Sequence, residues 1–112
     1  MELKAEKKKD TLYVQITGEL DLHTATDFSQ GLDKYLQKYP SIKNLILDLK
    51  GIDFIDSSGL GVILSKYKLI SKKGGQIALV GVSPQVRRIF EVSGMLKIMS
   101  IYDNRQKAVA SL

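Results

Sequence analysis

Two adjacent hydroxyls, Ser57 and Ser58, lie between an apolar strand-like run and a helical pattern, in the segment Asp56-Ser57-Ser58-Gly59-Leu60-Gly61. This spacing places them at a helix N-terminus, where unpaired backbone N–H groups and the helix dipole favour an anion. Ser57 is therefore either an ordinary helix cap or a hydroxyl that gains and loses a phosphate. Gly59 and Gly61 would each cost about 1 kcal/mol inside a helix, which indicates that small residues here serve close approach by a partner.

Other sites that these residues could form fit less well. Residues 59–61 begin like a dinucleotide-binding loop, but Leu64 occupies the position of the third glycine, and the phosphate-loop pattern is absent. A hydrolase-type serine requires flanking glycines and a histidine base, whereas the only histidine, His23, is expected on a surface loop. The residues therefore predict neither a Rossmann-type nucleotide site nor a catalytic serine.

Composition limits the remaining classes of function. The chain has 112 residues, enough for one domain with a single core, and no cysteine, which excludes disulfides and cysteine-bound metals. Asp21, Asp53 and Asp56 could gather oxygen ligands, but three loop aspartates are common, so no metal or cofactor is expected. The net charge is +5, but the positively charged residues are scattered along the chain. Their densest run, Lys7-Lys8-Lys9, is flanked by acidic residues, so direct nucleic-acid binding is not expected. No apolar run has membrane-spanning length and no secretory signal follows Met1, so we expect a cytoplasmic protein without a membrane partner.

Hydrophobic periodicity predicts elements in the order ββαβαβαβα. Strands that alternate with helices imply right-handed crossovers, so we expect one α/β domain over residues 1–112. Its sheet should be mixed and mainly parallel, with an N-terminal antiparallel hairpin and about four helices. The expected strands cover residues 3–7, 11–18, 42–49, 77–82 and 96–102. The first expected helix begins after the capping residue Thr24 and ends near Tyr39, and the second begins near Ser57 and ends near Gly74. The third begins after the capping residue Ser83 and ends near Gly94, and the fourth begins after Asp103, which forms a capping box with Gln106.

Several of these segments together resemble a known family. Gly18-Glu19-Leu20-Asp21, the segment from Asp56 to Gly61, and Gly74-Gly75 have the order and spacing of bacterial anti-sigma factor antagonists, which are single-domain members of the STAS group. The stretch from Ser83-Pro84 to Ser93-Gly94 resembles the third helix of that family. The resemblance covers nearly the whole chain, and it implies a STAS-like fold without enzymatic activity.

The resemblance also implies a partner-switching function. Unphosphorylated family members bind an anti-sigma factor that is also a serine kinase, and this binding releases the sigma factor. The partner phosphorylates a serine of the antagonist, which ends binding, and a separate serine phosphatase restores it. By position the acceptor is Ser57, with Ser58 as the alternative. The residues that match the family's partner surface are Asp21, Asp56, Ser58, Gly59, Leu60 and Gly61.

Two other functions remain open from the sequence. The chain could be a STAS subunit of a transport or lipid-trafficking complex, in which the Asp56-Ser57-Ser58 element is only structural. It could also be a nucleotide-binding STAS module that uses the small-residue loop at 59–61.

Overall fold

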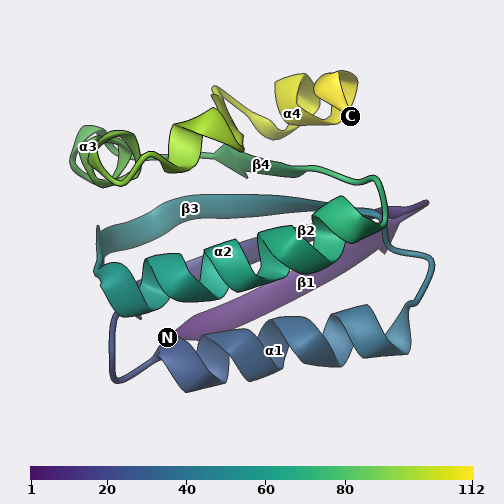
Figure 1. Ribbon diagram of the computed structural model, residues 1–112, viewed down its shortest axis with the longest axis horizontal. Coiled ribbons are helices and arrows are strands. Elements are labelled where there is room, and N and C mark those ends of the chain that lie inside the picture. Colours follow the sequence, from purple (N-terminus) through teal and green to yellow (C-terminus); the bar gives the residue numbers. More distant parts are fainter.

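Five strands form one mixed sheet in the computed structural model, which describes residues 1–112 (Figure 1). The strands are β1 (Glu2–Lys8), β2 (Thr11–Leu20), β3 (Asn44–Ile55), β4 (Ile77–Val80) and β5 (Ser100–Tyr102), and they lie in this order across the sheet. The helices are α1 (Ala25–Lys38), α2 (Ser57–Lys72), α3 (Pro84–Val92) and α4 (Arg105–Ser111), with a short 3₁₀ helix, η1 (Met95–Lys97). β1 pairs antiparallel with β2 and all other neighbours pair in parallel, which confirms the predicted hairpin, sheet type and element order.

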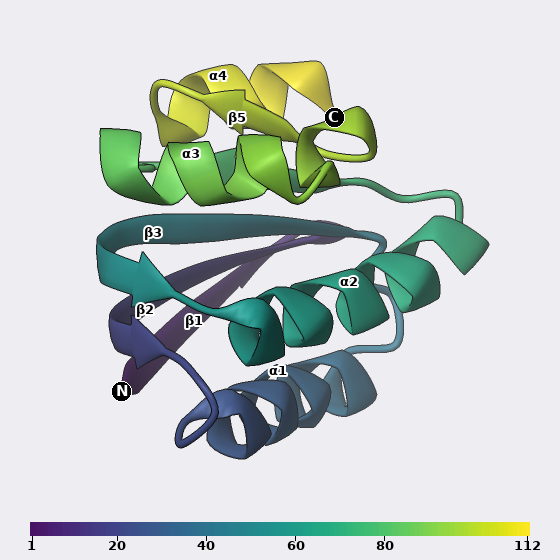
Figure 2. The same ribbon diagram turned by 60° about the vertical axis from the view of Figure 1, so that its left-hand side comes forward.

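Helices cover the two faces of the sheet unequally. Buried side chains of α1, α2 and α3 share the main core with Leu45 and Leu47 of β3, whereas Ile46 points to a smaller cluster that Ala108 of α4 closes. The run 45–47 is therefore buried on both faces, as its unbroken apolar character predicts. α1 and α2 lie side by side in both views (Figures 1 and 2). No helix of the structure combines the length and the apolar character that crossing a bilayer requires.

The third strand is longer than predicted. It was expected to end at residue 49, but β3 continues to Ile55 because the end of β2 continues beside it, with Gly18 opposite Ile52 and Leu20 opposite Ile55. β4 ends opposite Asp48, so the rest of β3 extends beyond β4. Residues 51–55, which lie outside the expected strand 42–49, are therefore strand, and Asp56 follows them directly.

The expected last strand is mostly not a strand. Of residues 96–102 only Ser100–Tyr102 pair with the sheet, and η1 precedes them. Gly94, with a φ of 80°, turns the chain out of α3, and the buried Met95 and Met99 then face the core four residues apart, at a helical spacing. The predicted cap of α4 is also wrong, because the side chain of Asn104, rather than Asp103, accepts the backbone N–H of Lys107 at 2.9 Å.

Candidate functional site

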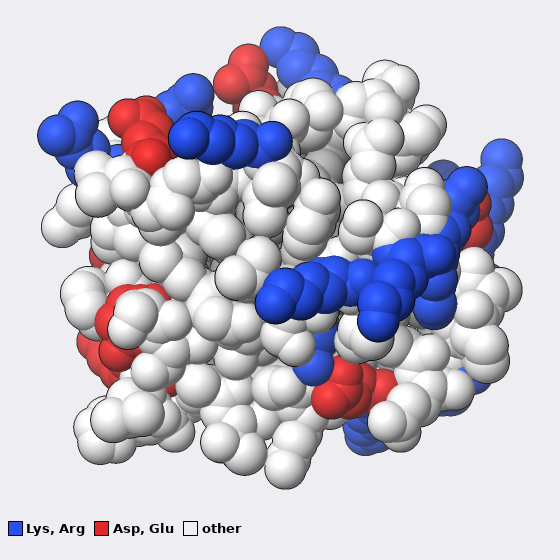
Figure 3. All heavy atoms as spheres, in the orientation of Figure 1, with Lys and Arg blue, Asp and Glu red and all other residues white.

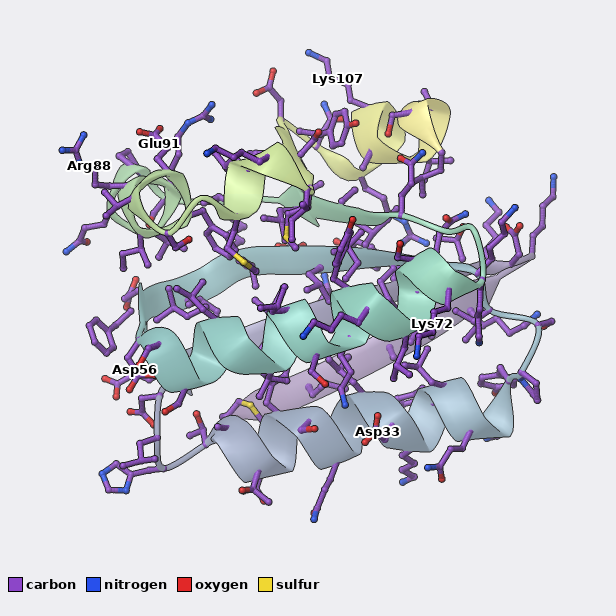
Figure 4. The ribbon with its side chains drawn as sticks, viewed as in Figure 1. Asp33, Asp56, Lys72, Arg88, Glu91 and Lys107 are labelled. Atoms are coloured by element: carbon purple, nitrogen blue, oxygen red, sulfur yellow. The ribbon has the colours of Figure 1, made fainter.

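The parallel arrangement of β2 and β3 brings two connections to one edge of the sheet. α1 begins shortly after β2 ends, and α2 begins directly after β3, so both helix N-termini lie beside the carboxyl ends of these strands. The backbone N–H of Asp56 donates to the carbonyl of Leu20 at 3.0 Å, which holds the two strand ends together. Figure 4 shows Asp56 at the beginning of α2. The topology thus places the predicted site residues of the two connections next to each other.

The carboxylate of Asp56 joins both connections. Its Oδ1 accepts the backbone N–H groups of Ser58 at 2.8 Å and Gly59 at 3.1 Å, and its Oδ2 accepts the N–H of Leu22 at 3.1 Å. Asp56 has an extended backbone and is the N-cap of α2, so Ser57 is the first residue inside the helix. The interpretation of Ser57 as an ordinary cap is therefore wrong.

The hydroxyls of Ser57 and Ser58 are not used by the fold. Ser57 is exposed and Ser58 is half-buried. Side-chain hydrogen bonding in this turn comes from Asp56, and neither hydroxyl donates or accepts a hydrogen bond within the protein. The Ser57 oxygen is therefore open to solvent at the first turn of a helix whose end is already capped.

Asp21 organises the loop that precedes α1. Its Oδ1 accepts the backbone N–H groups of His23 at 2.9 Å and Thr24 at 3.2 Å. Burial acts to raise the pKa of Asp21, but these backbone hydrogen bonds outweigh it and the pKa is lowered, so the carboxylate is stabilised in its charged form. Thr24 was expected to cap α1 through its side chain, but its hydroxyl instead donates to the carbonyl of Glu19 at 2.7 Å. His23 is exposed, as predicted.

The two glycines at the start of α2 have different environments. Gly59 is buried, and a Cβ there would lie 2.5 Å from the carbonyl oxygen of Leu20 and 2.9 Å from Cγ1 of Ile55. The close approach at Gly59 is therefore to the chain's own strand ends, and the expectation of backbone left open for a partner is wrong there. Gly61 is exposed and a Cβ there would meet nothing within 4 Å, whereas Leu60 is half-buried.

One buried charged residue near the site was missed from the sequence. Lys66 of α2 is only 4% exposed, and its Nζ donates to Oδ1 of Asp33 at 2.7 Å and to Oγ of Ser29 at 3.0 Å, both on α1. The available signal was the spacing of Ile63, Lys66 and Ile70, which places the lysine on the buried stripe of the helix. This contact joins the middle of α2 to α1.

The largest described hollow lies elsewhere. A cavity of about 740 Å³ is lined by residues that include Lys9, Tyr13, Arg105 and Val109, between the β1–β2 hairpin and α4. It contains none of the predicted site residues. Asp21, Asp53 and Asp56 form no group that could hold a metal ion. Ser57 itself is exposed at the protein surface.

Comparisons with known proteins agree with this geometry. The family model of the STAS domain matches residues 2–108. The anti-sigma F factor antagonist of Paenibacillus polymyxa is 42% identical over 112 residues, which cover 100% of this chain and 95% of that protein. A crystal structure of a Thermotoga maritima protein, suggested to be an anti-sigma factor antagonist, matches with a TM-score of 0.88 and 29% identity over 97% of this chain and 92% of that one. The Bacillus cell fate determinant SpoIIAA in its phosphorylated form shares the fold, with a TM-score of 0.74 and 22% identity over 98% of both chains. This chain belongs to the STAS domain family and is similar over its full length to bacterial anti-sigma factor antagonists.

Proposed function

We propose that this chain is an anti-sigma factor antagonist whose unphosphorylated form binds an anti-sigma factor and thereby releases a sigma factor. The observation that carries the proposal is the exposed Ser57 hydroxyl, which has no hydrogen-bond partner and lies in a helix turn that Asp56 already caps. A relative 42% identical over the whole chain is named for this activity.

The finer proposal is that the anti-sigma factor is also a serine kinase that phosphorylates Ser57, and that a separate serine phosphatase reverses the modification. A phosphate adds about −1.5 to −2 charge and three acceptor oxygens to the side chain. Inside a packed interface it would be disfavoured by its bulk, by loss of its hydration and by repulsion from Asp21 and Asp56. Because the Ser57 hydroxyl makes no bond that the fold needs, the modification should remove binding without unfolding the domain.

Ser57 is favoured over Ser58 as the acceptor because of its exposure. Ser57 is exposed whereas Ser58 is half-buried, and a kinase must reach the oxygen with both its catalytic base and the transferred phosphate. Ser58 remains the alternative acceptor, one residue further into α2.

The experiment is incubation of the purified chain with the anti-sigma factor of the same organism and Mg-ATP, followed by mass spectrometry. We expect one added phosphate on the Ser57 peptide, none in Ser57→Ala, and one in the matched control Ser58→Ala. Calorimetry should then show binding of the unmodified chain and of Ser57→Ala, and strongly weakened binding of the phosphorylated chain. An unmodified Ser57 peptide with a kinase active on another substrate would refute the acceptor, and equal affinity of both forms would refute the switch.

A further inference from the structure

Two large apolar side chains are exposed on residues close to the Asp56 cap. Leu22 follows the end of β2 and is 72% exposed, and Phe54 lies near the end of β3 and is 47% exposed. Single exposed apolar residues are common on soluble proteins and need no explanation. These two differ because each lies close to Asp56: Leu22 donates its backbone N–H to the Asp56 carboxylate, and Phe54 lies two residues before Asp56 at the end of β3.

The backbone at or next to both residues is hydrogen-bonded to another part of the chain. The N–H of Leu22 donates to Oδ2 of Asp56 at 3.1 Å, and Phe54 belongs to a strand whose end is paired with β2. Burying a side chain against a partner is more favourable when the backbone beneath it is already fixed, because less conformational entropy is lost. An apolar side chain that becomes fully buried in an interface can contribute a large share of the binding energy.

The charge around this pair is also unlike that of the rest of the chain. Residues 18–32 and 51–65 cover the ends of β2 and β3, the two connections and the first turns of α1 and α2. They contain none of the 17 Lys and Arg residues but hold five carboxylates: Glu19, Asp21, Asp27, Asp53 and Asp56. The chain as a whole has a net charge of +5, so its remainder is strongly basic. Figure 3 shows the acidic side chains without neighbouring basic ones at the end where α2 begins, and basic side chains over the other half of that helix. On that end of the molecule Figure 4 places Arg88 on α3, apart from the two connections.

We infer that Leu22 and Phe54 are the apolar anchors by which this chain docks on the anti-sigma factor, and that the partner face receiving them is apolar at its centre and basic at its rim. This inference rests on the proposed function and assigns the chemistry of its interface. A basic rim would steer the acidic end of this chain into the encounter, and the apolar centre would hold it there.

The inference fixes how phosphorylation acts. A phosphate on Ser57 adds negative charge to an end that is already acidic, so a basic partner still attracts the modified chain. Its effect must then come from its bulk, its lost hydration and repulsion from Asp21 and Asp56 in the packed complex. Phosphorylation should therefore raise the dissociation rate and leave the association rate close to that of the unmodified chain.

The test is stopped-flow binding of the full chain to the anti-sigma factor of the same organism, with ADP in place of ATP so that no phosphate is transferred. The association rate of the unmodified chain should fall about tenfold or more between low and high salt. Asp27→Asn and Asp53→Asn should each slow association, whereas the exposed control Asp103→Asn on the α4 side should not. Leu22→Ser and Phe54→Ser should each raise the dissociation constant about tenfold or more through faster dissociation, whereas Val109→Ser, which is 52% exposed on α4, should not.

Each result decides one part of the reasoning. An association rate independent of salt would overturn the basic rim, and this measurement needs no variant. If Leu22→Ser and Phe54→Ser both bind with unchanged affinity, and their circular dichroism spectra match that of the wild type, these residues are not the anchors. Normal binding of the unmodified chain would then leave the proposed function in place. Failure of the unmodified chain to bind would overturn the proposed function, and the inference with it.

Discussion

Replacing Gly59 by alanine should destabilise the fold, whereas the same change at Gly61, two residues along α2, should stabilise it. At Gly59 the added Cβ would lie 2.5 Å from the carbonyl oxygen of Leu20, and that carbonyl also accepts the N–H of Asp56. Backbone at a strand end cannot move aside as the tip of a flexible side chain can, and Cγ1 of Ile55 is a further obstacle at 2.9 Å. Relief of the clash therefore requires a shift of the strand end that helps to hold the cap.

The magnitudes of the two effects can be compared. Overpacking of this kind costs about 1–3 kcal/mol, and the better helix propensity of alanine returns up to about 1 kcal/mol, so Gly59→Ala should lose about 1–2 kcal/mol. At Gly61 a Cβ meets nothing within 4 Å, so only the propensity term remains and Gly61→Ala should gain about 0.5–1 kcal/mol.

Urea and thermal unfolding followed by far-ultraviolet circular dichroism measure both variants under the same conditions. For a domain of this size each kcal/mol corresponds to a shift of about 3–6 °C in Tm. The two variants should therefore move the Tm in opposite directions. A Gly59→Ala chain that melts at or above the wild-type temperature would refute the close packing of α2 on the strand ends. Since Gly61 is also a predicted contact residue, its alanine variant should be more stable and yet bind the anti-sigma factor no better.

Three further changes probe the contacts around the site. Asp56→Ala removes the acceptor of three backbone N–H groups and should cost about 1–2 kcal/mol in urea unfolding, with Asp56→Asn intermediate. Lys66→Met keeps the buried apolar stem of the lysine, so its free energy of unfolding should stay close to that of the wild type. Asp33→Ala leaves the buried Lys66 cation without its carboxylate and should lower the free energy of unfolding by more. Equal free energies of unfolding for the two variants would contradict this account. Burial acts to raise the pKa of Asp21, but the backbone hydrogen bonds from His23 and Thr24 lower it. The contribution of the Asp21 carboxylate to stability should therefore be complete above its ordinary pKa of 3.8 and be lost as the pH falls through the lowered pKa. An NMR titration of the Asp21 carboxyl carbon measures this pKa.

The fold could be predicted from the sequence because its signals are local. The unbroken apolar run at residues 45–47, the alternation in β2 and the Ser83-Pro84 start of α3 each specify an element without reference to its neighbours. The misplaced boundaries depend on distant residues instead. β3 continues to Ile55 because β2 continues beside it, and only Ser100–Tyr102 of the last expected strand reach the sheet.

The start of α2 was located correctly along the sequence, but the hydrogen bonding around it was not. Spacing placed a polar turn at the start of α2, and it could not distinguish which of Asp56 and Ser57 caps the helix. The second oxygen of Asp56 binds Leu22, 34 residues away, and that contact exists only because β2 and β3 end at the same edge. The partner roles of the six predicted contact residues remain predictions that binding measurements must decide; these residues are Asp21, Asp56, Ser58, Gly59, Leu60 and Gly61.

The cap assignment changes what a phosphate on Ser57 would do to the protein itself. A free helix N-terminus would draw the phosphate inward, onto unpaired N–H groups, and stabilise it. Here the carboxylate of Asp56 already accepts the N–H groups of Ser58 and Gly59, so that position is occupied by a negative charge. Repulsion between this carboxylate and a phosphate on the next residue offsets the roughly 0.3–1 kcal/mol that the helix dipole offers an anion. A modified Ser57 side chain would therefore be turned away from the helix end and toward solvent, which is the direction from which a partner must approach.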